Sequence, residues 1–337
     1  MSIWVVALFI LGFVLIIKGG DWFVEAAVWI AEVTHIPKIL IGATIVSLAT
    51  TLPELFVSLF AVLDGSVGLG IGNAIGSIIC NTGLILSIAL MASPPKIRKK
   101  IVLTKGALLF AAVATLTVTA WNGTIAPVEG LYLFAILALF ILYNVQSVKR
   151  SKLETEDEIL EDQKEIRHID TDKRNIIINI LKFGFGAGAI ILGANLLVNN
   201  GVIIASFLGI SETVIGLTVV ALGTSLPELV TTITSLVKKH GEMGVGNILG
   251  ANILNIVLVL GTCAVSSKSG LVLPNETSAL ALFSKPRTLS FDIPIVMLML
   301  AILLLPLLLG KPGKLRRWQG FALIGVYALY ILSVIVL

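Results

Sequence analysis

The sequence contains few charged residues. Of its 337 residues, 13% are charged and 57% are hydrophobic, whereas soluble domains carry about 25% charged residues. An aqueous core cannot absorb so much apolar sequence, so part of the surface must face lipid. This excludes water-soluble enzymes and nucleic-acid-binding proteins. We therefore interpret the net charge of +4 as a sign of membrane orientation, and expect no nucleic-acid partner.

Residues that bind soft metals are also scarce. The chain has two cysteines, Cys80 and Cys263, both in apolar segments, and three scattered histidines. We favour buried structural thiols over a disulfide or metal role for the cysteines. The first apolar run begins at Ile3 with no basic residue before it and no cleavage site after it. We therefore expect it to be a membrane span and not a signal peptide.

Long apolar segments are abundant. A membrane helix needs about 20 mainly apolar residues, and ten segments qualify, so the predicted fold class is all-α integral membrane. The ten predicted spans are residues 3–31, 39–63, 69–92, 101–120, 125–147, 176–200, 212–237, 243–265, 291–310 and 317–336.

A charged segment divides the predicted spans into two groups of five. It covers residues 148–175, and we expect a cytoplasmic linker between a first repeat at 1–147 and a second, inverted repeat at 176–337. With the N-terminus outside, twenty lysines and arginines fall in cytoplasmic segments. Only Lys268, Lys285 and Arg287 fall in external ones. This bias predicts ten spans with both termini outside.

Two pairs of segments repeat at an offset of 174 residues. IGATIVSLATTLPELFVSL at 41–59 matches IGLTVVALGTSLPELVTTI at 215–233, and GNAIGSIICN at 72–81 matches GNILGANILN at 246–255. Because each half holds an odd number of spans, the second half must enter the membrane from the opposite side. The halves are then related by a pseudo-two-fold axis in the membrane plane, an arrangement that is frequent in secondary transporters.

Each half places one glutamate deep within an apolar span, Glu54 in the first and Glu228 in the second. A charged side chain at the bilayer centre costs roughly 2.5–3.5 kcal/mol on insertion scales. A buried carboxylate paired with a basic group is the structural alternative. Lys18 is the only Lys or Arg that we place well inside a span, and it could serve at most one of the two. We therefore predict a cation site at these glutamates.

Oxygen ligands surround the two glutamates in the sequence. Hydroxyls three or four residues before each glutamate share its helix face, although such a hydroxyl can also bond back to its own helix. Pro53 and Pro227 should free carbonyls near Ala49 and Gly223 from the helix ladder. The side chains in this set are Thr50, Thr51, Thr224 and Ser225, joined by Ser77, Asn81 and Asn255 from the following spans.

These ligands indicate Ca2+ as the substrate. Ca2+ takes six to eight oxygen ligands, and no His or Cys cluster indicates Zn2+ or Cu+. Two carboxylates match one divalent ion, and they could equally hold Na+. Competition of the two ions for one site, combined with alternating access, would give antiport.

The paired TxLPEL and GNxxG(S/A)xxxN segments resemble the Ca2+/cation antiporter superfamily, and in particular prokaryotic sodium/calcium exchangers. The resemblance extends to RWQG at 317–320. It implies ten helices, an inverted repeat and alternating access, in which the first and sixth helices slide against a core. The ion ligands that it implies are Thr50, Thr51, Glu54, Ser77, Asn81, Thr224, Ser225, Glu228 and Asn255, with backbone carbonyls at Ser47 and Ala221.

Two positions depart from the family pattern. Ala251 stands where a serine is common, and Asn255 stands where many relatives carry Asp, an acid associated with K+ use in potassium-dependent relatives. Proton-coupled relatives usually carry a glutamate in a GNxxE motif, and neither copy here has it. The sequence thus favours Na+ over H+ as the coupling ion, with H+/Ca2+ antiport as the alternative.

The functional hypothesis is a Na+/Ca2+ antiporter of the plasma membrane and not an enzyme. We weighed a passive channel, against which the inverted repeat argues, and an intramembrane protease, against which the lack of an Asp dyad argues. We expect no cofactor, with Ca2+ and Na+ as transported substrates. We expect the protein to lie in the lipid bilayer, without an obligate protein partner.

Overall fold

Helices make up most of the protein. The computed structural model describes residues 2–161, 172–208, 221–273, 286–309 and 315–336. Nine helices within these ranges are long and apolar enough to cross a membrane, and Leu226–Val237 is a shorter apolar helix. The all-α membrane fold is thus confirmed. The shorter helix ends the predicted span 212–237, whose first residues lie outside the described ranges.

The elements of the first half begin with an apolar helix of 32 residues, and two π-helices and a 3-10 turn interrupt the helical segments that follow. In chain order they are α1 (Ile3–Thr34), α2 (Lys38–Ile41), the π-helix η1 (Gly42–Val46), α3 (Ser47–Leu63), α4 (Val67–Cys80), the π-helix η2 (Asn81–Leu86), α5 (Ser87–Ala92), α6 (Lys99–Thr119), the 3-10 helix η3 (Ala120–Asn122), the strand β1 (Thr124–Ile125) and α7 (Pro127–Glu161).

The second half begins at Lys173. Its described elements are α8 (Lys173–Phe207), α10 (Ala221–Thr224), α11 (Leu226–Val237), α12 (Gly241–Leu254), the π-helix η5 (Asn255–Leu260), α13 (Gly261–Ser266), the strand β2 (Leu271–Val272), the π-helix η6 (Thr288–Asp292), α14 (Ile293–Leu309) and α15 (Arg317–Val336).

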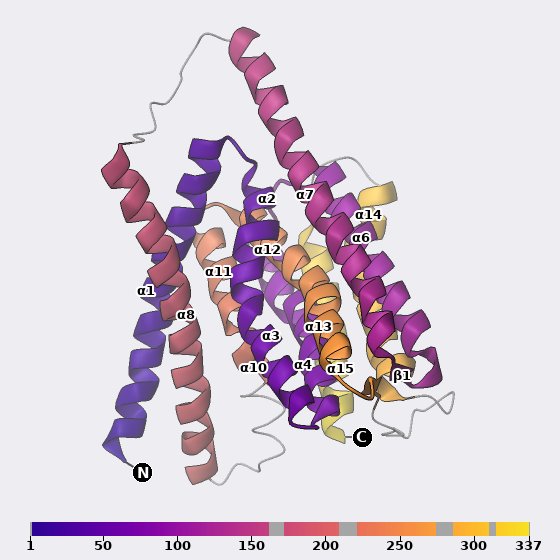
Figure 1. The fold of residues 1–337 in the computed structure, drawn as a ribbon. Coiled ribbons are helices and arrows are strands. Elements are labelled where there is room, and N and C mark those ends of the chain that lie inside the picture. Colours follow the sequence, from indigo (N-terminus) through magenta and orange to yellow (C-terminus); the bar gives the residue numbers. More distant parts are fainter. Residues whose placement is uncertain (1, 162–171, 209–220, 274–285, 310–314, 337) are drawn as a thin grey trace.

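Both chain ends lie at the same face of the bundle (Figure 1). Helix α7 extends beyond the opposite face, and it continues to Glu161, well into the predicted linker. The two short strands pair antiparallel near the face of the termini, with Thr124 opposite Val272 and Ile125 opposite Leu271. They join the α6–α7 connection to the segment after α13.

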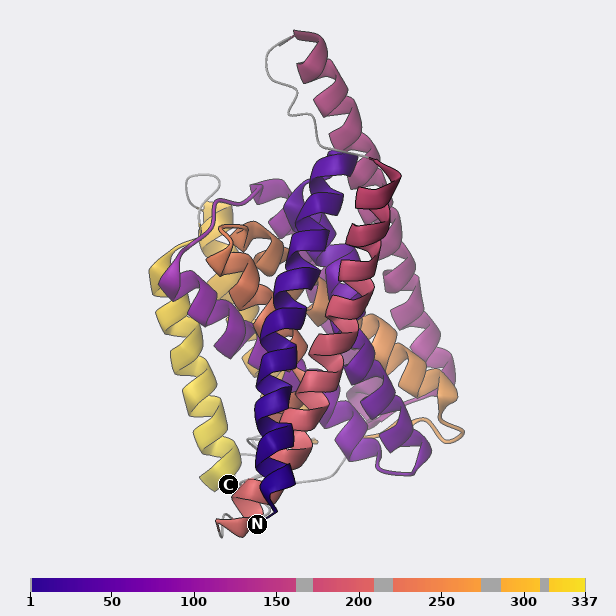
Figure 2. The same cartoon turned by 90° about the vertical axis from the view of Figure 1, so that its left-hand side faces the viewer.

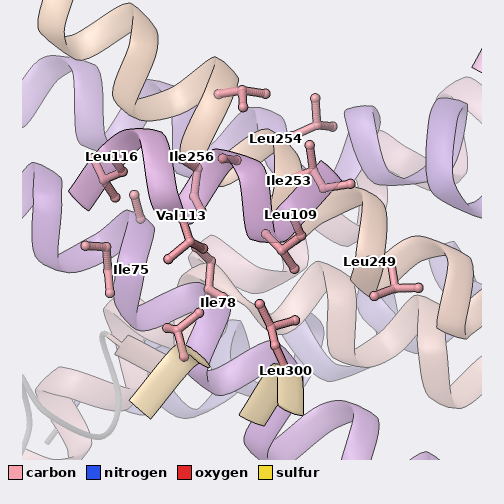
Figure 3. Close-up of a cluster of buried hydrophobic side chains, with 14 of the residues drawn as sticks. Ile75, Ile78, Leu109, Val113, Leu116, Leu249, Ile253, Leu254, Ile256 and Leu300 are labelled. Carbon is pink, nitrogen blue, oxygen red and sulfur yellow. The ribbon is translucent and has the colours of Figure 1, made fainter. Parts of the chain in front are cut away.

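Two repeat-related spans form the centre of the bundle. Buried residues make up 78% of the most apolar stretch of Val67–Ala92 and 83% of that of Gly241–Ser266, against 22% in α1. Their apolar side chains interlock with those of α6 and α14 (Figure 3). Ile75 and Ile78 of α4 and Ile253 of α12 lie in this cluster. Helices α1 and α8 instead lie side by side at the edge (Figures 1 and 2).

Glycines bring α1 and α8 into backbone contact at two places. A Cβ added at Gly193 would lie 2.8 Å from the carbonyl oxygen of Gly12, and one added at Gly186 would lie 2.9 Å from that of Gly19. Gly12 and Gly19 are the counterparts of Gly186 and Gly193 at the repeat offset. The two contacts are therefore related by the pseudo-two-fold axis. Such close approach is typical of small residues between membrane helices.

A second set of glycines seats α12 against the first half. An added Cβ would collide with the carbonyl of Met243 at Gly42, with the carbonyl of Ile39 at Gly246, and with Ser47 at Gly250. Gly246 and Gly250 therefore allow α12 to approach the first half closely. At their counterparts, Gly72 and Gly76, an added Cβ would meet none of the atoms that the structure describes.

Ion pairs connect α1 to both α8 and α11 at the face opposite the termini. Lys238, which follows α11, lies 2.8 Å from Glu25 and 3.3 Å from Asp21 of α1. Glu25 also lies 3.2 Å from Lys182 of α8. Burial lowers the pKa of Lys238, but its bonds to Glu25 and Asp21 outweigh burial and raise that pKa above its usual value. Exposed pairs contribute about 0.2–1 kcal/mol each, so they fasten α1 only weakly.

Replacing Gly193 with alanine should destabilise the protein, whereas Gly188→Ala on the same helix should not. Alanine in a helix interior normally stabilises by roughly 0.5–1 kcal/mol relative to glycine. The methyl group that alanine adds at position 193, however, would press on the α1 backbone. Such overpacking costs about 1–3 kcal/mol. At Gly188, an added Cβ has no described neighbour within 4 Å. Thermal unfolding midpoints in detergent measure both variants. A Gly193→Ala protein as stable as the Gly188→Ala protein would contradict the close contact.

Candidate cation site

Glu54 on α3 and Glu228 on α11 meet inside the bundle. Both side chains are fully buried, with 0% exposure. Each carboxyl group lies close enough to the other to interact with it electrostatically. Two like charges in a buried site repel each other, and each also loses its hydration, so the pair is costly unless something neutralises it.

Unsatisfied polar atoms gather on the predicted ligands. In the described part of the chain, eleven buried side-chain atoms have no hydrogen-bond partner, and ten of them are oxygens. Buried polar groups are nearly always paired, because an unpaired one costs about 1–3 kcal/mol. The residues that carry these atoms are Thr51, Glu54, Ser77, Asn81, Ser225, Glu228, Thr232 and Asn255.

Basic side chains do not neutralise the two glutamates within the described ranges. Every described ion pair involves other residues, and Lys18 is exposed on α1. We did not expect a buried lysine elsewhere, but Lys105, near the start of α6, is fully buried and donates a hydrogen bond to Asn144 of α7. Its position near the span end hid this burial.

Two symmetry-related hydrogen bonds join the halves beside the glutamates. The Thr50 hydroxyl donates to the side-chain oxygen of Asn247 at 3.3 Å, and the Thr224 hydroxyl donates to that of Asn73 at 3.1 Å. At the repeat offset, Thr50 corresponds to Thr224 and Asn73 to Asn247. Each threonine oxygen keeps lone pairs that could bind a cation, so these residues can both join the halves and act as ligands.

The two site asparagines, Asn81 and Asn255, each begin a π-helix. Asn81 opens η2 and Asn255 opens η5, at positions that correspond in the two repeats. A π-helix inserts an extra residue per turn and is often found at functional sites. The Asn81 amide donates to the oxygen of Asn252 at 3.1 Å, and Asn252 donates to Thr82 at 2.7 Å. Asn252 therefore orients Asn81.

The proline-containing helices differ between the halves. Helix α3 continues through Pro53 without a break, whereas the second helix is interrupted at Ser225, between α10 and α11. The Ser225 backbone, at φ −88° and ψ 5°, occupies the sparsely allowed bridge region. Of the two predicted carbonyl ligands, Ser47 begins α3 and Ala221 begins α10. The Ser47 carbonyl lies 3.3 Å from the Thr50 hydroxyl, so it is an alternative acceptor to Asn247 for the single hydroxyl hydrogen.

The edge helices α1 and α8 cover the site. Phe23 of α1 and Ile190 of α8 line a small void with Thr50 and Pro227, and this void has no space for a water-sized sphere. Phe23 is fully buried, and its ring centroid lies 4.5 Å from that of Phe183 on α8. On this side an apolar lid therefore covers Thr50 and Pro227, which lie close to the glutamates in the sequence.

Sequence reasoning missed two polar residues, Asn252 and Thr232. Asn252 has isoleucine, Ile78, as its counterpart in the first half, so the repeat gave no signal for it. Thr232 follows Glu228 by four residues and is buried with an unpaired hydroxyl. A spacing of four residues places Thr232 on the same helix face as the carboxylate. The same spacing rule, applied to residues that follow each glutamate as well as to those that precede it, would have identified Thr232.

Comparisons with known proteins agree on one family. The sodium/calcium exchanger protein family matches residues 4–146 and 178–336. The sodium/calcium exchanger MaX1 of Methanosarcina acetivorans is 31% identical and covers 96% of each chain. The inner membrane protein YrbG of Escherichia coli K12 is 30% identical, covering 96% of this chain and 95% of its own. A solved structure of the sodium-calcium exchanger NCX_Mj, soaked without Na+ and Ca2+, superposes with a TM-score of 0.79 at 29% identity over 99% of both chains. The chain therefore belongs to the sodium/calcium exchanger family.

Proposed function

We propose that this protein exchanges Ca2+ for Na+ across a membrane, with both ions competing for the site at Glu54 and Glu228. The observation that carries the proposal is the pair of buried carboxylates that interact with each other and have no basic partner in the described chain. A bound cation would supply the positive charge that the described side chains do not. It would neutralise both carboxylates and coordinate the unpaired oxygens.

The ligand set suits Ca2+ and Na+. Ten unpaired oxygens exceed the six to eight that Ca2+ takes, so a subset can hold one Ca2+. Two carboxylates balance its charge of +2. Asn255 contributes an amide where an aspartate would add a third negative charge, which keeps the site matched to one divalent ion. The relatives MaX1 and NCX_Mj are both described as sodium–calcium exchangers, which supports Na+ as the coupling ion.

Alternating access requires that the site open to each side in turn. We propose that α1 and α8 move together across the site. The glycine contacts between them favour their motion as one unit, and the ion pairs at Lys238 that tie α1 to the core are weak. Because the lid residues Phe23 and Ile190 belong to these two helices, their displacement would uncover Thr50 and the glutamates.

The placement in the membrane follows from the same proposal. We expect two five-helix repeats at residues 1–147 and 176–337, joined by the charged linker at 148–175. The excess of Lys and Arg in loops predicts that the face carrying α7 and Lys238 is cytoplasmic and that both termini are outside. The plasma membrane is the expected location.

Ion-gradient transport in vesicles tests the proposed exchange. Purified protein in vesicles loaded with Na+ should take up 45Ca2+ on dilution into Na+-free medium, because outward Na+ flow drives Ca2+ inward. Parallel vesicles with K+ or proton gradients should show little uptake. Uptake that follows a proton gradient and ignores Na+ would contradict Na+ coupling, and uptake without any counter-ion would indicate a channel.

Glu54→Gln and Glu228→Gln should each abolish exchange without unfolding the protein. Loss of one carboxylate leaves the divalent charge half compensated. Breaking a buried charge pair costs about 3–5 kcal/mol, so 45Ca2+ uptake should fall at least about 100-fold. Glu242→Gln, at the first turn of α12, is the matched control and should transport normally. Ca2+ should raise the thermal unfolding midpoint of the control but not of the site variants. Normal uptake by Glu54→Gln would refute the site.

Asn252→Ile should weaken Ca2+ binding through Asn81. Isoleucine is the residue that the first repeat already has at this position, Ile78, so a similar shape is accommodated there. Without the Asn252 oxygen, the Asn81 amide loses its partner and its orientation. Loss of such supporting residues typically costs 10–100-fold in metal affinity, so we expect the Ca2+ concentration for half-maximal uptake to rise by about 10-fold. Asn195→Ile, at an exposed position on α8, should leave it unchanged. Equal effects of the two substitutions would contradict this role.

A further inference from the structure

A cavity of about 430 Å3 opens between α2, α6 and α7, away from the glutamates. It lies at the start of α6 and the cytoplasm-facing part of α7, the face to which Figure 1 shows α7 rising. The described residues that line it are Pro37, Leu40, Arg98, Lys100, Ile101, Tyr143, Gln146, Ser147 and Arg150. Three of these are basic and none is acidic.

The polar lining comes from one face of α7 and from the start of α6. Tyr143, Ser147 and Arg150 are spaced by four and three residues, so they form one stripe along α7. Across the cavity, Arg98 immediately precedes α6 and its side chain makes no capping bond to the helix. The first backbone N–H groups of α6 therefore lie beside the basic side chains. A helix N-terminus attracts anions through these groups and through the helix dipole.

On α6, the lining of the cavity leads inward to a buried lysine. Lys105 follows Ile101 by one turn, and its ammonium nitrogen lies 4.8 Å from the Phe140 ring centroid and 5.7 Å from that of Tyr143. Its described polar partner is the neutral Asn144 side chain. Tyr143 thus stands between the cavity and a fully buried lysine side chain that has no carboxylate partner in the described chain. An anion in the cavity would favour the charged form of this lysine.

We propose that this cavity binds a phosphate group. Basic side chains, a tyrosine hydroxyl, an amide and a helix N-terminus are the donors that phosphate oxygens accept from, and the cavity has room for one such group. Basic pockets between membrane helices at the cytoplasmic side are sites for anionic lipid headgroups, and free phosphate offers the same chemistry. The site is separate from the cation site, and nothing in the exchange proposal depends on it.

Thermal unfolding of the full-length protein in neutral detergent tests the proposal. Dioctanoyl phosphatidylglycerol, dioctanoyl phosphatidylcholine and inorganic phosphate are titrated separately. Stabilisation by phosphatidylglycerol at concentrations where phosphate has no effect identifies a lipid headgroup. Stabilisation by both at similar concentrations identifies phosphate itself as the ligand. If neither shifts the unfolding midpoint relative to phosphatidylcholine, the proposal is overturned.

Two kinds of variant locate the effect. Arg98→Gln combined with Lys100→Gln should raise the half-saturating ligand concentration at least about 10-fold. Lys96→Gln combined with Lys99→Gln removes the same charge from the same segment without touching the cavity lining, and should leave it unchanged. Ser147→Phe fills the cavity without changing charge and should also abolish the shift. Equal losses in the two double variants, or full binding by Ser147→Phe, would show attraction to general surface charge and overturn the site.

Discussion

The main energetic constraint on this structure is the free-energy cost of burying two carboxylates in its apolar interior. Glu54 and Glu228 are fully buried and interact with each other, and the described helices bring no basic group to them. These carboxylates do not stabilise the fold, because apolar residues at the same positions would carry a smaller free-energy cost of burial. The polar atoms around them are likewise left unpaired. A bound positive ion, as proposed above, would neutralise both carboxylates, and its binding would raise the stability of the bundle by mass action.

Close helix contacts make this organisation possible. Side chains would hold α12 away from the first half, but Gly42, Gly246 and Gly250 let the backbones approach. The approach in turn sets Asn247 against Thr50, and the equivalent bond sets Asn73 against Thr224. In a membrane, helix association gains little from the hydrophobic effect and depends on packing and polar contacts. The same few polar residues therefore join the two halves at the centre of the bundle and belong to the proposed cation site.

Much of this could be predicted from the sequence. Apolar length identifies membrane helices, and a repeat at a fixed offset identifies Glu54 and Glu228 as counterparts. Features that break the repeat could not be predicted from it. Asn252 has an isoleucine counterpart, and Ser225 interrupts a helix where the first half continues through Pro53. The burial of Lys105 was missed because it lies near a span end, where lysines usually reach water, whereas here its side chain turns inward over Phe140.

Two sets of contacts occur in reciprocal pairs, as in a two-fold dimer. One set is the glycine contacts between α1 and α8, and the other is the two threonine–asparagine hydrogen bonds. In a two-fold interface, one surface meets a second copy of itself, so that if residue i touches residue j, then j touches i. Because each half supplies one glutamate, one threonine and one asparagine to the centre, neither half alone carries the full set, and the set is complete only where the two halves meet.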